Sequence, residues 1–254
     1  MRYETVVYQK REQIGGITLN RPEVNNAINA RLAEELIDIC SEVSQDEEVR
    51  VVTITGAGGA FCVGTEWSSS LPSETAQTKL LSVAGVVAKL DCPVIVAING
   101  DALGQGLELA LACDLRIAAE TAHLGLPQIV SGVIPWDGGT QRLPRLVGRA
   151  QAMEMILLAE SISAREACRV GLVNKVVTLE ELSLVVADMA RGMVSSAPLA
   201  LKYAKEAIDK GLELTLEQGL CLEADLYLLL QTTGDRTEGV TAFLQKKQPK
   251  FKGK

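Results

Sequence analysis

The spacing of apolar positions in the first half of this chain alternates between a strand period and a helix period. Short runs rich in β-branched residues predict strands at residues 5–8, 14–19, 49–55, 93–98 and 115–118. Apolar residues recur at helical spacing from Leu32 to Val43, behind Asn29 as the expected N-cap, and further helices are expected at residues 73–90 and 106–113. This alternation predicts crossover connections around a mixed core.

The second half of the chain is patterned almost wholly as helices. Helical spacing is present at residues 150–158, 164–170, 179–195, 198–210, 214–231 and 237–246. The segment Ser195-Ser196-Ala197-Pro198 breaks this pattern, so we expect a core domain at residues 1–195 and a helical region at residues 196–254. The apolar faces of the last helices exceed what a small appendage buries by itself. They are therefore expected to cover the core or a neighbouring subunit.

Composition and charge indicate which kinds of molecule this chain is expected to bind. With 47% apolar and 22% charged residues among 254, the chain has the composition of a globular protein. The formal net charge of -7 counts against a nucleic-acid partner, because phosphate binding depends on clustered Lys and Arg. His123 is the single histidine, and no carboxylates stand at metal-ligand spacing around it, so no metal is expected.

Cysteine usage and hydropathy bear on the location of the protein. The six cysteines form no C-x-x-C pair and stand mostly in apolar stretches, which is typical of free thiols in a reducing cytoplasm. The first residues lack the basic start and apolar core of a signal peptide. Charged residues interrupt the most apolar region, residues 92–119, which argues against a membrane span. We therefore expect a cytoplasmic protein without a membrane partner.

Two glycine-rich segments, residues 60–66 and 100–109, each follow a predicted strand and precede a predicted helix. Glycine lets a backbone approach a ligand closely, and the N–H groups at a helix start point outward without a partner in the helix. Two such ends could converge on one oxygen and form an oxyanion hole, which stabilises a carbonyl that becomes an enolate. The alternative is that these glycines only let helices pack on strands.

Glu108 lies one helical turn after Gly104, within the second glycine-rich segment. Its neighbours Leu107 and Leu109 are apolar, so we expect its carboxylate to be at least partly buried. Burial raises a carboxyl pKa and a helix N-terminus lowers it, a combination that suits proton exchange near neutral pH. The structural alternative is a glutamate that pairs with Arg116 or caps a helix end.

Several motifs in these segments resemble one enzyme family. Residues 60–65 (AFCVGT) resemble the A-F-x-A-G-x-D loop of the crotonase, or enoyl-CoA hydratase/isomerase, family. Residues 100–114 (GDALGQGLELALACD) resemble its G-x-a-x-G-G-G-x-E-L-a-x-x-C-D segment. The similarity begins at residues 19–22 (LNRP) and continues through residues 135–148 (PWDGGTQRLPRLVG) to residues 238–244 (EGVTAFL). On these motifs the chain is identified as a member of the family.

The resemblance implies a mixed α/β fold with a β-β-α spiral core and a C-terminal helical trimerisation region. It implies assembly as a homotrimer or homohexamer. The implied substrate is an acyl-CoA thioester, with coenzyme A as part of the substrate and no separate cofactor.

The resemblance also assigns roles by position. The backbone N–H groups of Thr65 and Gln105 would form the oxyanion hole, and Glu108 would be the first catalytic glutamate. The residues implied at the CoA channel are Val24, Val63 and Gly64, and Lys246 would reach the CoA phosphates of an adjacent subunit. The pocket walls are expected to include Trp67, Leu71, Ile134 and Trp136.

The chain departs from the family pattern at three positions. Gln105 replaces the middle glycine of the second loop, Glu66 replaces the usual aspartate, and Gln128 stands where the hydratases have a second glutamate. An amide can hold water but does not exchange a proton near neutral pH. Either Glu108 therefore serves as both base and acid in a syn addition, or the reaction needs a single carboxylate.

Asp137, beside Trp136, is a candidate alternative acid, because relatives with other activities place an acid in this stretch. Its other interpretation is an N-cap for the helix that begins near Gly138.

We expect a lyase that hydrates an enoyl- or dienoyl-CoA in fatty-acid or aromatic-acid metabolism. Decarboxylation of an acyl-CoA stays open because it needs mainly the oxyanion hole. Double-bond isomerisation is a further alternative, although isomerases of this family tend to keep the carboxylate that is missing here. A non-catalytic RNA-binding member would present a basic helix face, which the acidic composition disfavours.

Overall fold

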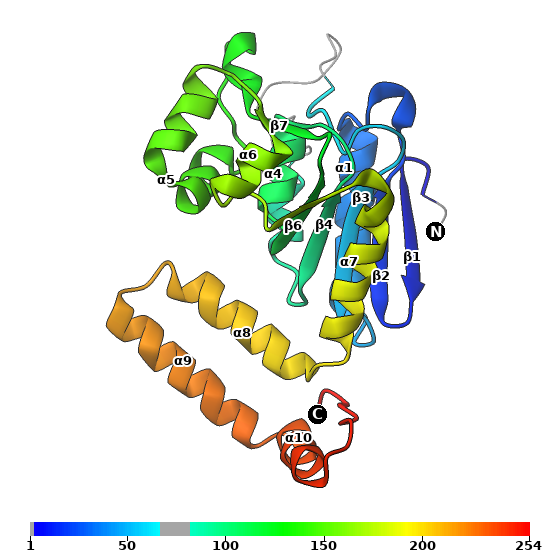
Figure 1. Ribbon diagram of the computed structural model, residues 1–254, viewed down its shortest axis with the longest axis vertical. Coiled ribbons are helices and arrows are strands. Elements are labelled where there is room, and N and C mark those ends of the chain that lie inside the picture. The colour runs from blue at the N-terminus through cyan, green and yellow to red at the C-terminus, as the bar shows by residue number, and fades with distance from the viewer. Residues whose placement is uncertain (1–2, 67–81) are drawn as a thin grey trace.

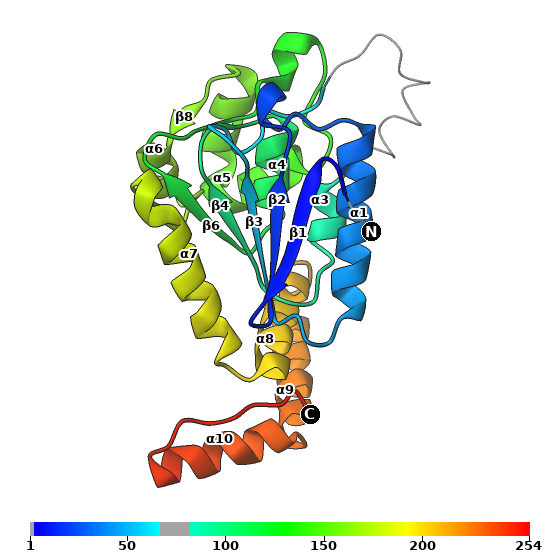
Figure 2. The ribbon, with the colours of Figure 1, turned by 90° about the vertical axis from the view of Figure 1, so that its right-hand side faces the viewer.

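A six-stranded sheet runs through the computed structural model, which describes residues 3–66 and 82–254 (Figures 1 and 2). The strand order is β1-β2-β3-β4-β6-β9, and among these described strands only β1 and β2 pair antiparallel. The strands are β1 (Val6–Arg11), β2 (Ile14–Leu19), β3 (Val51–Gly56), β4 (Val94–Ile98), β6 (Leu115–Ala119) and β9 (Lys175–Val177). All five predicted strands lie in this sheet.

Helices cover both faces of the sheet, so the central strand β4 is buried along its whole length. On one face, Ile95 packs against α7 (Leu179–Val194), the long helix that runs along one side of the sheet in Figure 2. The other face packs against α1 (Ala30–Gln45), α3 (Ala84–Val87) and α4 (Gln105–Leu111). The architecture is therefore a mixed α/β core with a largely parallel sheet.

The start of α1 was predicted correctly. The side chain of Asn29 accepts a hydrogen bond from Leu32 N at 2.9 Å, which is the N-cap expected from the sequence. The helix expected at residues 73–90 is represented by α3 alone, because residues 73–81 lie outside the described residues.

A smaller sheet stands at the end of the core where the parallel strands terminate. Its order is β5-β7-β8, and its short strands are β5 (Ala102–Leu103), β7 (His123–Gly125) and β8 (Ile162–Ser163). Around it lie η1 (Pro22–Val24), η2 (Pro127–Ser131), α5 (Gly139–Leu157) and α6 (Ala164–Arg169). Gly148, at φ 80° and ψ 161°, interrupts α5, so the helix predicted at residues 150–158 is the second part of α5.

The last three helices extend away from the sheet (Figures 1 and 2). They are α8 (Pro198–Gly211), α9 (Leu216–Gln231) and α10 (Gly234–Gln245). The predicted boundary at residue 195 falls between α7 and α8, and the division into two domains stays a prediction. In the described part of the chain no helix by itself has the length and hydropathy to cross a membrane. The pair α7 and α8 passes that test only jointly, across a bend of 106°.

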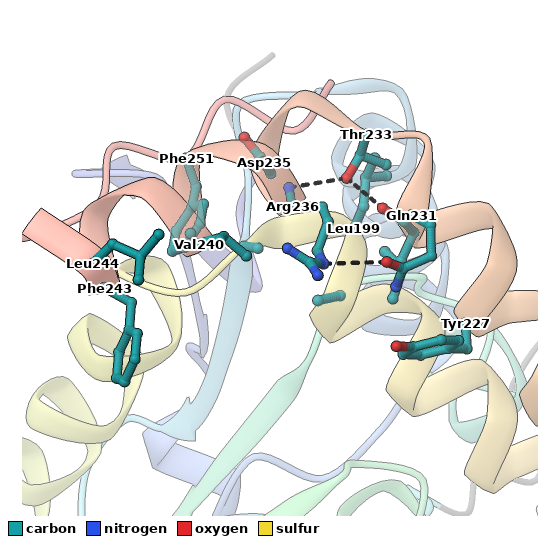
Figure 3. A pocket seen from close by; sticks show the side chains of 14 residues that line it. Leu199, Tyr227, Gln231, Thr233, Asp235, Arg236, Val240, Phe243, Leu244 and Phe251 are labelled. Carbon is teal, nitrogen blue, oxygen red and sulfur yellow. Dashed lines mark hydrogen bonds between the residues drawn. The ribbon is translucent and has the colours of Figure 1, made fainter.

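An apolar cavity of about 440 Å³ lies among α8, α9, α10 and the C-terminal tail. Figure 3 shows Leu199, Tyr227, Val240 and Phe243 around it. Phe243 is 83% exposed, so this cavity opens onto an apolar surface rather than into the core. None of the predicted catalytic residues lines it.

Candidate active site

The two glycine-rich segments lie side by side and are joined by backbone hydrogen bonds. Cys62 N donates to Asp101 O at 3.1 Å, and Leu103 N donates to Cys62 O at 2.9 Å. The first turn of α4 can approach this junction because residue 106 is glycine: a Cβ on Gly106 would lie 2.1 Å from Cys62 O. The sequence therefore permits a backbone contact that a side chain would prevent.

Gly64 brings Thr65 beside the start of α4. Its φ of 99° is a conformation that residues with a side chain rarely adopt, and a Cβ there would lie 3.2 Å from Gln105 N. Gln105 is the first residue of α4 and follows Gly104, whose φ is 53°. The structure thus brings together the loop that carries Thr65 and the N-terminal turn that carries Gln105.

The first loop is also held from outside by an ion pair. Arg21 Nη1 donates to Glu66 Oε2 and to Ala27 O, each at 2.6 Å. The side chain of Glu66, which stands where the family has aspartate, therefore joins the end of the first loop to Arg21, the residue before η1. Sequence reasoning singled out Glu66 but missed Arg21 as its partner, since 45 residues separate them.

Glu108 is fully buried and its carboxylate accepts three hydrogen bonds. Asp137 N and Gly139 N donate to Oε1, each at 2.8 Å, and Gln128 Nε2 donates to Oε2 at 3.0 Å. Burial raises the pKa of Glu108 to about 7; the Gly139 N–H opposes this rise, and the charge of Asp137 adds to it. The expected burial of Glu108 is confirmed, and its pKa suits a group that exchanges protons near neutral pH.

Two structural alternatives were considered for Glu108, a pair with Arg116 and a cap at a helix end. The pairing with Arg116 is wrong, because Arg116 Nε donates to Leu172 O at 2.8 Å and Nη1 donates to Cys113 O at 2.5 Å. The second alternative is right in part: Gly139 is the first residue of α5, so Glu108 does accept from the start of a helix. That contact also fixes the orientation of the carboxylate.

Gln128, in η2, occupies the space between Glu108 and the second loop. Its Nε2 atom lies 3.7 Å from the position of a Cβ on Gly104. Its Oε1 atom is buried and accepts no hydrogen bond from the described residues. A buried acceptor without a donor costs about 1–3 kcal/mol, which a water or a substrate hydroxyl bound there would recover.

Asp137 does not cap the helix that follows it. The N-cap of α5 is Gly138, which makes no side-chain capping bond, so the N-cap interpretation of Asp137 is wrong. Its buried carboxylate instead accepts four hydrogen bonds, which come from Ser82 Oγ at 2.8 Å, Val83 N at 2.9 Å, Ala84 N at 3.1 Å and Gln105 Nε2 at 3.1 Å. No sequence signal connected residues 82–84 to this site, because the contact spans more than 50 positions.

The residues expected at the CoA channel lie in different parts of the structure. Val63 N donates to Asn25 O at 3.2 Å, so the residue after Val24 is joined to the first loop beside Gly64. Trp136 is partly buried against the core beside Asp137. Lys246 caps the end of α10, which lies at the opposite end of the molecule from the loops in Figure 2.

The expected pocket walls are described in part. Trp67 and Leu71 lie outside the described residues, and Ile134 is 67% exposed. Within residues 3–66 and 82–254, no cluster of three or more His, Cys, Asp or Glu side chains is arranged to hold a metal ion.

Comparisons with known proteins identify similar sequences and structures. The family model for enoyl-CoA hydratase/isomerase matches residues 9–254. The chain is 38% identical to a crotonyl-CoA hydratase of Syntrophomonas wolfei, over 99% of each chain, and 37% identical to a short-chain-enoyl-CoA hydratase of Clostridium acetobutylicum, over 98% of this chain and 97% of that one. It resembles the crystal structure of enoyl-CoA hydratase from Bacillus anthracis with a TM-score of 0.96 and 39% identity, over 99% of this chain and 100% of the other.

Proposed function

The chain belongs to the enoyl-CoA hydratase/isomerase family, and we propose that it is a lyase that adds water across the double bond of an α,β-unsaturated acyl-CoA thioester. One observation carries this proposal. The fully buried carboxylate of Glu108 has a pKa of about 7 and stands on α4, whose first turn meets the first glycine-rich loop. Such a group can take a proton from water and return it within one catalytic cycle.

The loops supply the electrostatic part of the mechanism. We propose that the N–H groups of Thr65 and Gln105 bind the thioester oxygen and stabilise the negative charge that develops there. Preorganised donors of this kind favour the enolate over the ground-state carbonyl, and the loss of one donor costs about 3 kcal/mol. The close approach of the Gly64 backbone to Gln105 N supports the placement of both groups at one site.

Glu108 supplies the proton transfers, and Gln128 holds the water. The ionised Glu108 takes a proton from water while the water oxygen forms a bond to Cβ, and the π electrons of the double bond move into the enolate. Glu108 then returns that proton to Cα on the same face, so the net change is addition of H and OH. The buried Oε1 of Gln128 lies on the same amide that contacts Glu108, and it would accept the second hydrogen of the water.

We also propose that α8, α9 and α10 form the contact between subunits of a homotrimer or homohexamer. Large apolar side chains on these helices face solvent in the single chain: Ile208, Leu212, Leu216, Leu228, Phe243 and Leu244 are each more than 60% exposed. A monomer rarely leaves so many apolar residues of adjacent helices uncovered. Lys246, at the end of α10, would then reach the CoA of a neighbouring subunit.

The reaction is tested by incubating the protein separately with crotonyl-CoA, a cyclic dienoyl-CoA and methylmalonyl-CoA, and by identifying the products by mass. Hydration predicts a product heavier by one water from at least one of the unsaturated thioesters. Loss of carbon dioxide from methylmalonyl-CoA alone would instead establish a decarboxylase. If no thioester is turned over, the proposal is wrong.

A further inference from the structure

Gln105 has a side chain where the family pattern has a glycine, and that side chain is buried in the site with an exposure of 1%. Its Oε1 atom accepts a hydrogen bond from Thr65 Oγ1 at 2.7 Å. Its Nε2 atom donates to Asp137 Oδ2 at 3.1 Å. One amide therefore connects the first loop, the start of α4 and the segment before α5.

The connection extends from Asp137 to the proposed catalytic carboxylate. The same Oδ2 atom of Asp137 accepts from Val83 N and Ala84 N, which holds the carboxylate in place. The backbone N–H of Asp137 donates to Glu108 Oε1 at 2.8 Å. A continuous path of hydrogen bonds and one residue's backbone thus runs from the Thr65 hydroxyl through Gln105 and Asp137 to Glu108.

The chemistry of the path requires an amide at position 105. The Oδ2 atom of Asp137 also accepts from two backbone N–H groups, so the amide must present its NH₂ group to Asp137 and its oxygen to Thr65. The Thr65 hydroxyl then serves as the donor. A carboxylate at position 105 would repel Asp137, and an apolar side chain would leave the Thr65 hydroxyl and one Asp137 acceptor position without this partner.

We infer that Gln105 is a positioning residue: its side chain holds the Thr65 loop at a fixed distance from the Asp137 segment, so that the two oxyanion amides and Glu108 keep one relative arrangement. This inference rests on the proposed function, because it assigns that arrangement to the hydration step. A side chain that only filled space would have no need of hydrogen bonds in both directions. The inference therefore concerns kcat more than substrate binding.

The test measures kcat and KM of Gln105→Ala and Gln105→Glu with crotonyl-CoA, or with whichever enoyl thioester the wild type hydrates best. We expect kcat to fall about 10- to 100-fold in Gln105→Ala, with little change in KM, since a displacement of about 1 Å has that effect. Gln105→Glu is expected to lose more, because its charge faces Asp137. Gln9→Ala, at an exposed glutamine of β1, is the matched control and should keep wild-type kcat.

Thr65 offers an independent test that leaves position 105 intact. Thr65→Val removes the hydroxyl and should lower kcat, whereas Thr65→Ser keeps it and should restore most of kcat. The double variant Thr65→Val with Gln105→Ala should lose no more than Gln105→Ala, because both changes break one path.

Wild-type kcat in Gln105→Ala, or independent effects in the double variant, would overturn the inference while leaving hydration itself intact. A wild-type protein that hydrates no thioester would instead remove both the proposed function and this inference.

Discussion

The side-chain amide of Gln128 donates a hydrogen bond to the carboxylate of Glu108 at 3.0 Å. A neutral donor at this position stabilises the ionised form of Glu108 without adding a second titrating group. A carboxylate in the same place would compete with Glu108 for one proton. The proposed site therefore concentrates its acid–base chemistry on Glu108, while four hydrogen bonds hold the nearby Asp137 carboxylate in place.

Replacement of Glu108 by glutamine should abolish the hydration activity while keeping the fold. In Glu108→Gln, the new side-chain oxygen can still accept from Asp137 N and Gly139 N, but it cannot take a proton from water. We expect kcat to fall about 10²- to 10⁴-fold, measured as the rate of enoyl-thioester loss. Glu217→Gln, at an exposed glutamate of α9, is the matched control. A Glu108→Gln enzyme with kcat near that control would show that another group is the base.

The pH dependence follows from the raised pKa of Glu108. Its ionised form is the base, and its pKa is about 7, so kcat/KM for hydration should rise with pH and level off above that value. Well below the midpoint the slope should be about tenfold per pH unit. Stopped-flow or initial-rate measurements across the range would locate the midpoint. A rate that falls as pH rises through neutrality would mean that the protonated form is the active one.

Introducing the family's second glutamate at position 128 should shift the pH dependence of kcat/KM. In Gln128→Glu the two carboxyl groups would stand in contact, and repulsion between them would raise the pKa at which the second proton leaves. We expect the midpoint of the kcat/KM profile to move above 7 and the profile to gain a second step. An unchanged profile would indicate that residue 128 does not contact Glu108 during the reaction.

The contact between the two loops should not tolerate a methyl group at residue 106. A Cβ on Gly106 would meet Cys62 O at 2.1 Å, so Gly106→Ala must separate the loops. We expect a loss of stability of about 1–3 kcal/mol and a fall in kcat of about 100-fold, from thermal unfolding and steady-state kinetics. The control is Gly192→Ala in α7, where nothing lies within 4 Å of the new atom. Equal behaviour of the two variants would contradict the proposed loop contact.

The subunit contact is tested by a charge on the exposed apolar surface of α10. Phe243 is 83% exposed in the single chain, and Phe243→Asp would place a carboxylate in the proposed interface. We expect the mass from light scattering to fall from that of a trimer or hexamer toward that of a monomer. Gln9→Asp should leave the mass unchanged. A monomeric wild type would refute the interface directly.

The sequence predicted best the features that depend on near neighbours in the chain. The five strands and the Asn29 cap follow from local periodicity and from a side chain that bonds three residues ahead. The burial of Glu108 follows from its apolar neighbours on a short helix. The strands β5, β7, β8 and β9 were missed because two or three residues carry no measurable period.

Two structural alternatives, one for Asp137 and one for Glu108, were wrong for a different reason. The first paired Asp137 with the helix after Gly138, which is close in sequence, and the second paired Glu108 with Arg116, which is opposite in charge. The structure instead pairs Asp137 with residues 82–84 and Gln105, and Arg116 with backbone carbonyls. Hydrogen bonds between distant segments depend on how the elements pack, and no local pattern records that packing.

The amino-acid sequence by itself determined the family, the order of the longer strands and of most helices, and the position of one buried carboxylate one turn after Gly104 in the second glycine-rich segment. These properties are local, because side-chain periodicity and the conformational freedom of glycine act within a few residues. Only the tertiary structure decided that Glu108 accepts from residues 128, 137 and 139, and that Gln105 connects Thr65 to Asp137. Those contacts form because the folded core brings separate loops within hydrogen-bond distance, where donors and acceptors select each other by geometry rather than by position in the chain.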